Sequence, residues 1–167
     1  MGVLRRILGV TGGLAAGAVV LAGCTPAATV APGPHASDPM CAEVLRATPQ
    51  ELGGLERRST TSQSTRAWGD PPITLRCGVE VLGPTTEHCV TITSPDGPTV
   101  DWVMREPEDG QADVLTLTTF GRSPAVEVQV PQQWEGQGHD AILSDLAPAI
   151  TLVPQTRECL SLEEDPL

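Results

Sequence analysis

The sequence predicts an α+β fold, namely a mainly antiparallel sheet with one or two helices packed on one face, stapled by disulfides. Three observations support this prediction. Most of the chain consists of short segments in which apolar and polar residues alternate, as in half-buried strands. Apolar residues at helical spacing occur only near the two ends of this region. The region also contains an even number of cysteines, which suits disulfide pairing.

The first helix is predicted to begin at Asp38 and Pro39, because aspartate caps a helix N-terminus and proline suits the first helical position. Pro49 or the pair Gly53-Gly54 is expected to end it. Its buried face is expected to comprise Cys41, Val44, Leu45 and Thr48. Because this helix has only one apolar face, it needs a sheet to lie on.

The second helix is predicted after Asp140, again a capping residue, and Pro148 is expected to kink or shorten it. Its apolar stripe comprises Ile142, Leu143, Leu146 and Ile150. Between the helices, strands are predicted over residues 55–59, 64–68, 73–79, 89–93, 100–105, 114–120 and 125–130. The last two are expected to pair as a hairpin through the turn that contains Arg122.

The N-terminal segment has the pattern of a bacterial lipoprotein signal. Arg5 and Arg6 precede an apolar run, residues 7–22, which leads to Cys24 through small residues. This run is shorter than the roughly 20 residues that a membrane-spanning helix needs, and its glycines are poor helix formers. The pattern therefore predicts cleavage before Cys24 and lipid attachment to its sulfur through a thioether. The alternative is an uncleaved membrane helix that carries a cysteine by chance.

This signal sets the expected domain organisation. Residues 1–23 form the signal peptide, and residues 24–37, rich in proline and alanine, form a mobile tether. Residues 38–160 form a single α+β domain, and residues 161–167 form a solvated acidic tail. We expect the protein to be held by its lipid at the outer face of the cytoplasmic membrane, without spanning it.

The charge of the chain excludes several partners and chemistries. The formal net charge is −11, and loss of Arg5 and Arg6 with the signal leaves 8 basic against 21 acidic residues. An acidic surface repels nucleic acid and anionic headgroups, so neither is expected as a specific partner. The sequence contains no lysine, which excludes a Walker A site and a Schiff base.

The cysteines other than Cys24 predict two disulfides, because an extracytoplasmic compartment is oxidising. They are Cys41, Cys77, Cys89 and Cys159. Three connectivities are possible. We favour Cys77 with Cys89, which would close a short loop between adjacent strands. The second disulfide would then join Cys41 to Cys159 and tie the two ends of the domain.

Five blocks of the domain carry a family resemblance: WGDPPI at 68–73, LRCGV at 75–79, VDW at 100–102, GRSPAVEV at 121–128 and VP at 130–131. Together they resemble the DUF3515 family of secreted or lipid-anchored actinobacterial proteins. The likeness covers nearly the whole domain. No activity is established for the family, so the resemblance implies a cell-envelope protein without naming its ligand.

Catalysis is not indicated by any motif of the sequence. The chain lacks the G-x-S-x-G motif of α/β-hydrolases, and neither His88 nor His139 has a neighbouring nucleophile or metal-ligand spacing. A zinc site of Cys77, residues 87–89 and Cys159 is an alternative, but no C-x-x-C pair supports it. We expect no metal, no cofactor and no enzymatic activity. The alternative is a small envelope hydrolase or transferase that uses His139 or His88 with nearby acids.

A candidate binding surface is predicted from polar and aromatic residues on turns and outward strand positions. It comprises Trp68, Asp70, Arg76, Asp101 and Arg122. Indole supplies contact area and arginine binds carboxylates through two parallel bonds, so such a surface suits a partner protein or a cell-wall component. The alternative is structural: Trp68 and Trp102 lie in the core, Asp70 stabilises its turn, and Arg76 pairs with Asp101 across neighbouring strands.

Overall fold

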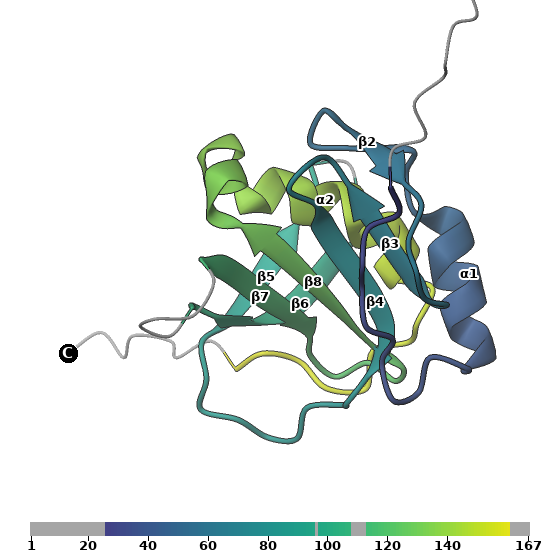
Figure 1. The fold of residues 1–167 in the computed structure, drawn as a ribbon. Helices are drawn as coiled ribbons and strands as arrows, with labels where there is room; N and C mark the ends of the chain where they lie inside the picture. Colours follow the sequence, from purple (N-terminus) through teal and green to yellow (C-terminus); the bar gives the residue numbers. More distant parts are fainter. Residues whose placement is uncertain (1–25, 96, 108–112, 161–167) are drawn as a thin grey trace, which may run out of the picture.

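The computed structural model describes residues 26–95, 97–107 and 113–160. These residues form one eight-stranded antiparallel sheet and two α-helices (Figure 1), which confirms the predicted α+β class. The elements are α1 (Pro39–Ala47), β1 (Glu51–Leu52), β2 (Leu55–Arg58), β3 (Thr65–Trp68), β4 (Ile73–Val79), β5 (Cys89–Thr93), β6 (Thr99–Arg105), β7 (Val114–Thr119), β8 (Ala125–Pro131), the 3-10 helix η1 (Gln132–Gln137) and α2 (His139–Ile150).

The strands lie in the order β1-β2-β3-β4-β8-β7-β6-β5. The loop after β4 therefore carries the chain from the middle of the sheet to its far edge, where β5 begins (Figure 1). The next strands return toward the middle, and β8 closes the sheet by pairing with both β7 and β4. The predicted β7–β8 hairpin is confirmed.

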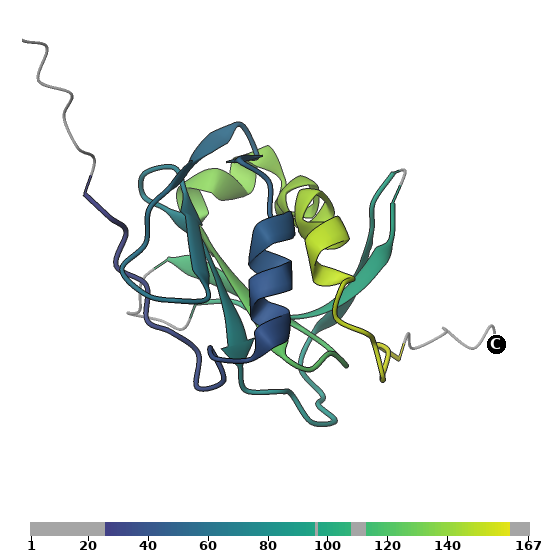
Figure 2. The ribbon, with the colours of Figure 1, turned by 90° about the vertical axis from the view of Figure 1, so that its right-hand side faces the viewer.

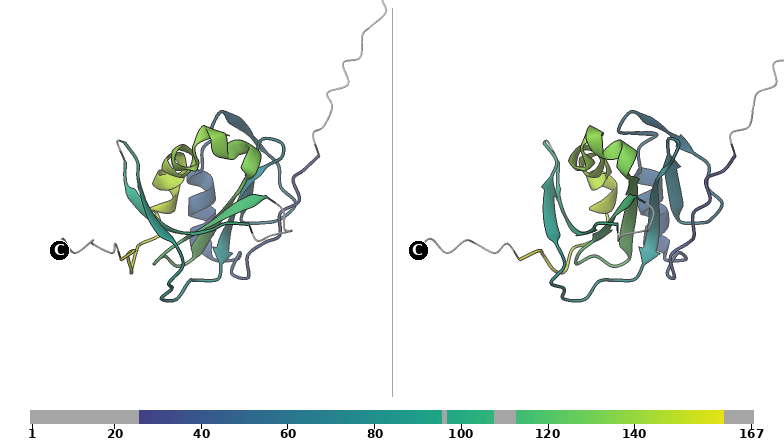
Figure 3. Two further views of the ribbon diagram at one scale, coloured as in Figure 1. Left: turned by 90° about the vertical axis from the view of Figure 1, so that its left-hand side faces the viewer. Right: turned by 60° about the vertical axis from the view of Figure 1, so that its left-hand side comes forward.

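Both helices pack on the concave face of the curved sheet (Figures 2 and 3). Helix α1 contacts α2 and β4, and α2 also contacts β5 and β6. Trp68 and Trp102 are fully buried in the layer between sheet and helices, together with Val44 and Leu146 of the helices. The structural interpretation of the two tryptophans is therefore correct.

Pro148 lies inside α2 without ending it, because the helix continues to Ile150. Proline has no N–H, so the carbonyl of Ser144 loses its usual donor four residues later. The hydroxyl of Ser94, which follows β5, donates to this carbonyl at 3.0 Å. A hydrogen bond from the residue after β5 thus replaces the missing helical one. Of the two expected effects of Pro148, a kink or a shorter helix, the shortening does not occur.

The disulfide pairing that we favoured from the sequence is wrong. The four cysteines do form two disulfides, but these are Cys41–Cys77 and Cys89–Cys159. Cys77 and Cys89 cannot pair because β4 and β5 are separated by three other strands. Cys41 instead projects from the buried face of α1 onto β4, and Cys159 reaches the start of the edge strand β5.

The structure also differs from the expected mobile tether at residues 26–37. Ala28 and Val30 are buried against the outer side of β3, and Ala28 pairs in parallel with Thr60. Further along, the N–H of His35 donates to the carbonyl of Gly78 at 2.8 Å. The segment has too few apolar residues to fold by itself, but β4 and the loop after β2 provide hydrogen-bond partners for its backbone.

The predicted signal peptide, the lipidation site Cys24 and the acidic tail lie outside the described residues. Among the helices that the structure describes, none is long and apolar enough to span a membrane.

Candidate functional site

The five residues of the predicted binding surface do not lie together. Trp68 is fully buried, and its indole N–H donates to the carbonyl of Pro49 at 3.1 Å. Asp70 is exposed and forms an ion pair with Arg58 at 3.1 Å. Arg76 binds Glu127 of the adjacent strand, with Nε to Oε1 at 2.7 Å and Nη2 to Oε2 at 3.1 Å, and does not pair with Asp101.

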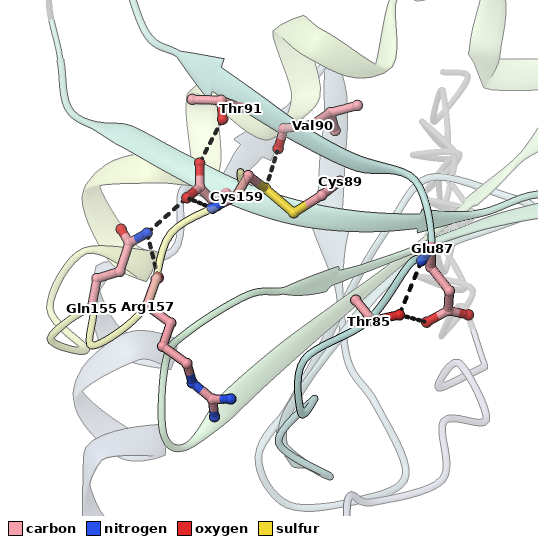
Figure 4. Close-up of a disulfide and its surroundings, with 9 residues drawn as sticks. Thr85, Glu87, Cys89, Val90, Thr91, Gln155, Arg157 and Cys159 are labelled. Carbon is pink, nitrogen blue, oxygen red and sulfur yellow. Dashed lines mark hydrogen bonds between the residues drawn. A yellow bond between two sulfur atoms is a disulfide. The ribbon is translucent and has the colours of Figure 1, made fainter. Parts of the chain in front are cut away.

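Asp101 is buried and fixes the C-terminal segment to the sheet. Its carboxylate accepts hydrogen bonds from the hydroxyl of Thr91 at 2.7 Å, the amide of Gln155 at 2.9 Å and the backbone N–H of Cys159 at 2.8 Å. Figure 4 shows these donors beside the disulfide that joins Cys159 to Cys89. The carboxylate is thus satisfied by the protein itself, which is a structural role.

Arg122 is likewise buried, and it completes the same network. Its guanidinium donates to the carbonyl of Val153 and, at 2.9 Å, to the side-chain oxygen of Gln155. Burial lowers the pKa of Arg122, and the charge of Asp101 opposes this shift. Because Asp101 and Arg122 are both buried, neither can contact a partner, and neither belongs to a binding surface.

His88 and His139 are the histidines of the enzymatic alternative. His88 is exposed in the loop before β5, and His139 begins α2 with Nε2 at 3.2 Å from a carboxylate oxygen of Asp140. Within the described ranges, neither imidazole hydrogen-bonds to a serine, threonine or cysteine side chain. The zinc alternative is wrong, because Cys77 and Cys159 are in disulfides, and no other cluster of metal-ligating residues occurs in this part of the chain.

A hollow at the end of β2 gathers three of the arginines. It has a volume of about 420 Å³, and no acidic residue lines it. The lining residues are Gln50, Arg57, Arg58, Ser59, Thr60 and Arg66. Every one of these side chains carries a hydrogen-bond donor. In a chain with a net charge of −11, this concentration of positive charge is the most distinctive polar feature of the described surface.

The β2–β3 hairpin positions the arginines. Arg57 pairs with Trp68 in the ladder, so its side chain lies on the helix-bearing face, and Arg66, two residues before Trp68, lies on the same face. Arg66 Nη2 donates to the carbonyl of Leu45 near the end of α1 at 2.9 Å. Arg57 and Arg66 thus come together through strand pairing, although the chain separates them by a turn.

The electrostatics of the hollow are unbalanced. Burial lowers the pKa of Arg66, and the nearby positive charge of Arg57 lowers it further. The Nε atoms of Arg58 and Arg66 are buried without a hydrogen-bond partner. The positive charge of Arg58 is balanced by its ion pair with Asp70. Among the described residues, no ion pair joins Arg57 or Arg66 to an acid. A bound anion would supply the missing negative charge.

A second hollow, of about 180 Å³, lies on the opposite face of the sheet around Arg76, Glu127 and Arg105. Its arginines are already paired, because Arg105 Nε also binds Glu87 Oε1 at 2.6 Å. The charges in this hollow cancel, so it is the weaker candidate for a binding site.

The first hollow was not predicted from the sequence, because its arginines do not form a sequence motif. They come together only when β2 and β3 pair as a hairpin. The available signal was the placement of Arg57 and Arg66 on either side of one predicted turn.

Fold and site together define a disulfide-stapled α+β domain with an arginine-lined surface hollow. The chain belongs to the family DUF3515, described as proteins of unknown function, whose model matches residues 7–159. This confirms the family resemblance. Searches of the curated proteins and of the solved structures gave no match.

Proposed function

We propose that this chain is a noncatalytic lipoprotein of the cell envelope that binds an anionic partner or envelope component. In this proposal Cys24 carries lipid and holds the domain at the outer face of the cytoplasmic membrane. The signal pattern that precedes Cys24 supports the anchor. The arginine-lined hollow supports the binding role and replaces the surface expected around Trp68 and Arg122.

The unbalanced charge of Arg57 and Arg66 is the observation on which this proposal depends most. Two guanidinium groups near one another repel, and a bound anion would offset this repulsion. Strands and hydrogen bonds fix Arg66 in advance, so little conformational entropy is lost on binding. Arginine binds carboxylates and phosphates through paired N–H groups, which makes both classes suitable ligands.

The anchor is tested by growing cells with radioactive palmitate. The protein with Cys24 intact should incorporate label, mature to a chain that begins at residue 24, and sediment with membranes. The Cys24→Ala variant should remain unlabelled and unprocessed. An unlabelled wild-type protein of full length would overturn the lipoprotein part of the proposal.

The binding role is tested by crosslinking in living cells followed by mass spectrometry. Wild-type protein should yield a reproducible crosslinked partner or envelope fragment. The double variant Arg57→Gln/Arg66→Gln should lose it. The matched control Arg46→Gln/Arg157→Gln removes the same charge from exposed positions elsewhere and should retain it. Equal capture by both double variants would show that the hollow is not the binding site.

The noncatalytic part is tested with the histidines. The double variant His88→Ala/His139→Ala should complement a deletion strain as well as wild type does. Loss of complementation by a variant that is still folded would instead favour the hydrolase or transferase alternative.

A further inference from the structure

We infer that the arginine-lined hollow binds the phosphate group of an anionic phospholipid in the membrane to which the chain is anchored. This inference rests on the proposed function and names the ligand of the same site. It also reverses the sequence-based expectation that anionic headgroups are repelled, since that expectation treated the negative charge as evenly spread.

Arg58 links the hollow to the segment that follows the predicted lipidation site. Arg58 Nη2 donates to the carbonyl of Pro26 at 3.0 Å, and Ala28 is held by backbone hydrogen bonds to Ser59 at 2.8 Å and Thr61 at 3.0 Å. The chain therefore enters the domain beside β2 (Figure 1). Cys24 is only two residues before Pro26, and two residues span at most about 7 Å. A lipid on Cys24 would thus lie close to Arg58, which lines the hollow from the face of the sheet opposite to Arg57 and Arg66.

The donors of the hollow match the acceptors of a phosphate group. A phosphate has several acceptor oxygens, and the hollow offers guanidinium, hydroxyl and amide donors with no acid among them. Its volume of about 420 Å³ has room for a headgroup phosphate together with part of its glycerol. A carboxylate would satisfy the same arginines. The phosphate is favoured because the anchor places a phosphate layer next to the site.

The acidic residues near the hollow lie outside its lining. The acids closest in the fold are Asp70, which is paired with Arg58, and the exposed Glu51 and Glu56, which face each other between β1 and β2. Exposed charges farther than about 10 Å away are largely screened by salt. These three acids do not line the hollow, so the side chains that face a bound headgroup there are positive or neutral. The anchor also raises the effective concentration of lipid at the site.

The experiment uses the mature chain from residue 24, which contains every described residue, with its disulfides formed. The free thiol of Cys24 is coupled to a maleimide lipid in vesicles of phosphatidylcholine alone or of equal parts phosphatidylcholine and phosphatidylglycerol. Because this anchor is made chemically, the result does not depend on whether cells lipidate Cys24. Amide hydrogen exchange of residues 50–60 is compared between the two vesicles.

Phosphatidylglycerol should slow this exchange by up to about thirtyfold, because two arginines near an anionic surface contribute about 1 kcal/mol each. The Arg57→Gln/Arg66→Gln variant should exchange equally on both vesicles, and the Arg46→Gln/Arg157→Gln control should behave as wild type. Arg57→Gln alone, which removes no hydrogen bond among the described residues, should lose part of the effect even if the double variant fails to fold.

Two results would overturn the inference. One is equal exchange of the wild-type chain on both vesicles. The other is protection of residues 50–60 by inorganic phosphate or glycerol phosphate in solution without any difference between the vesicles, which would identify a soluble anion as the ligand.

Discussion

Asp101 is a carboxylate that is 4% exposed and accepts three hydrogen bonds from the protein. Its donors come from β5 and from the C-terminal segment, so a single side chain joins parts of the chain that are far apart in sequence. Hydrogen bonds to a charged acceptor contribute more than neutral ones. Arg57 and Arg66 represent the opposite case, since their charges lack an acidic partner within the described structure. We therefore interpret the satisfied charge of Asp101 as structural, and the unpaired charges of Arg57 and Arg66 as the basis of the proposed anion binding.

Asp101→Asn should destabilise the domain by about 2 kcal/mol, because the new amide group turns a donor toward groups that are themselves donors. The measurement is the free energy of unfolding from urea denaturation with the disulfides intact. Asp70→Asn is the control, since Asp70 is an exposed partner of Arg58 and should cost less than about 1 kcal/mol. Equal effects of the two substitutions would contradict the role assigned to Asp101.

Glu87 gives a prediction about pH. Arg105 binds both of its carboxylate oxygens, at 2.6 and 2.7 Å, and this hydrogen bonding lowers the pKa of Glu87 from 4.5. A carboxyl whose pKa is lowered by folding stabilises the protein above its unfolded pKa, and this contribution is lost as the pH falls through the lowered value. The stability contributed by Glu87 should thus be complete near neutral pH and disappear in acid.

Glu87→Gln should therefore reduce the free energy of unfolding by less than about 1 kcal/mol near neutral pH, because the pair is exposed. The difference from wild type should shrink below pH 4.5. Urea denaturation at several pH values measures it, with Glu56→Gln as the charge-matched control. A difference that stays constant into acid would show that the ion pair is not its cause.

At the scale of elements, the segment 26–37 shows how backbone partners decide order. Its composition predicts a mobile chain, yet it runs along β3 and β4 because the sheet offers unpaired backbone groups and a close crossing at two glycines. Gly33 passes against the backbone of Gly78, whose φ of +82° suits glycine. Packing of this segment brings Pro26 to Arg58, one of the residues that line the hollow.

Gly33→Ala should release this segment, because the added methyl group would collide with the carbonyl of Gly78. Amide exchange of residues 28–36 should accelerate at least tenfold, whereas exchange in β6 and β7 should remain as in wild type. Gly83→Ala is the matched control, since a methyl group there meets no atom within 4 Å. Unchanged exchange in Gly33→Ala would show that the segment does not depend on this crossing.

At the scale of the whole molecule, the two disulfides join different parts of the fold and differ in burial. Cys41 and Cys77 are fully buried and join α1 to the sheet, whereas Cys89 and Cys159 are half-buried and join the edge strand β5 to the C-terminal segment. A thiol reductant needs access to a sulfur atom. The two bonds should therefore differ in how readily they are reduced.

Limited treatment with a small reductant should open Cys89–Cys159 before Cys41–Cys77. Alkylation at successive times, followed by peptide mass spectrometry, reports which cysteines become free. The second bond should resist until the protein unfolds, so added urea should remove the difference. Simultaneous loss of both bonds in native conditions would contradict the prediction.

Local pattern predicted the elements well. Alternation along residues 73–79 and 125–130 identified β4 and β8, and Asp38 with Pro39 marked the start of α1, because these signals depend on neighbours in the sequence. The two-residue strand β1 and the 3-10 helix η1 were missed, since each is too short to show a period. The expectation that Pro148 shortens the helix was wrong for a related reason. The hydroxyl that replaces the missing N–H donor belongs to Ser94, which is distant in the sequence.

By itself, the sequence determined the α+β class, the family, the bounds of most strands and the fact that four cysteines pair. Only the tertiary structure decided which cysteines pair, that Asp101 and Arg122 are buried, and that Arg57 and Arg66 meet in one hollow. The physical reason is range. Periodicity and capping act over a few residues, whereas pairing and charge balance depend on strand order, which joins residues that are far apart in the chain.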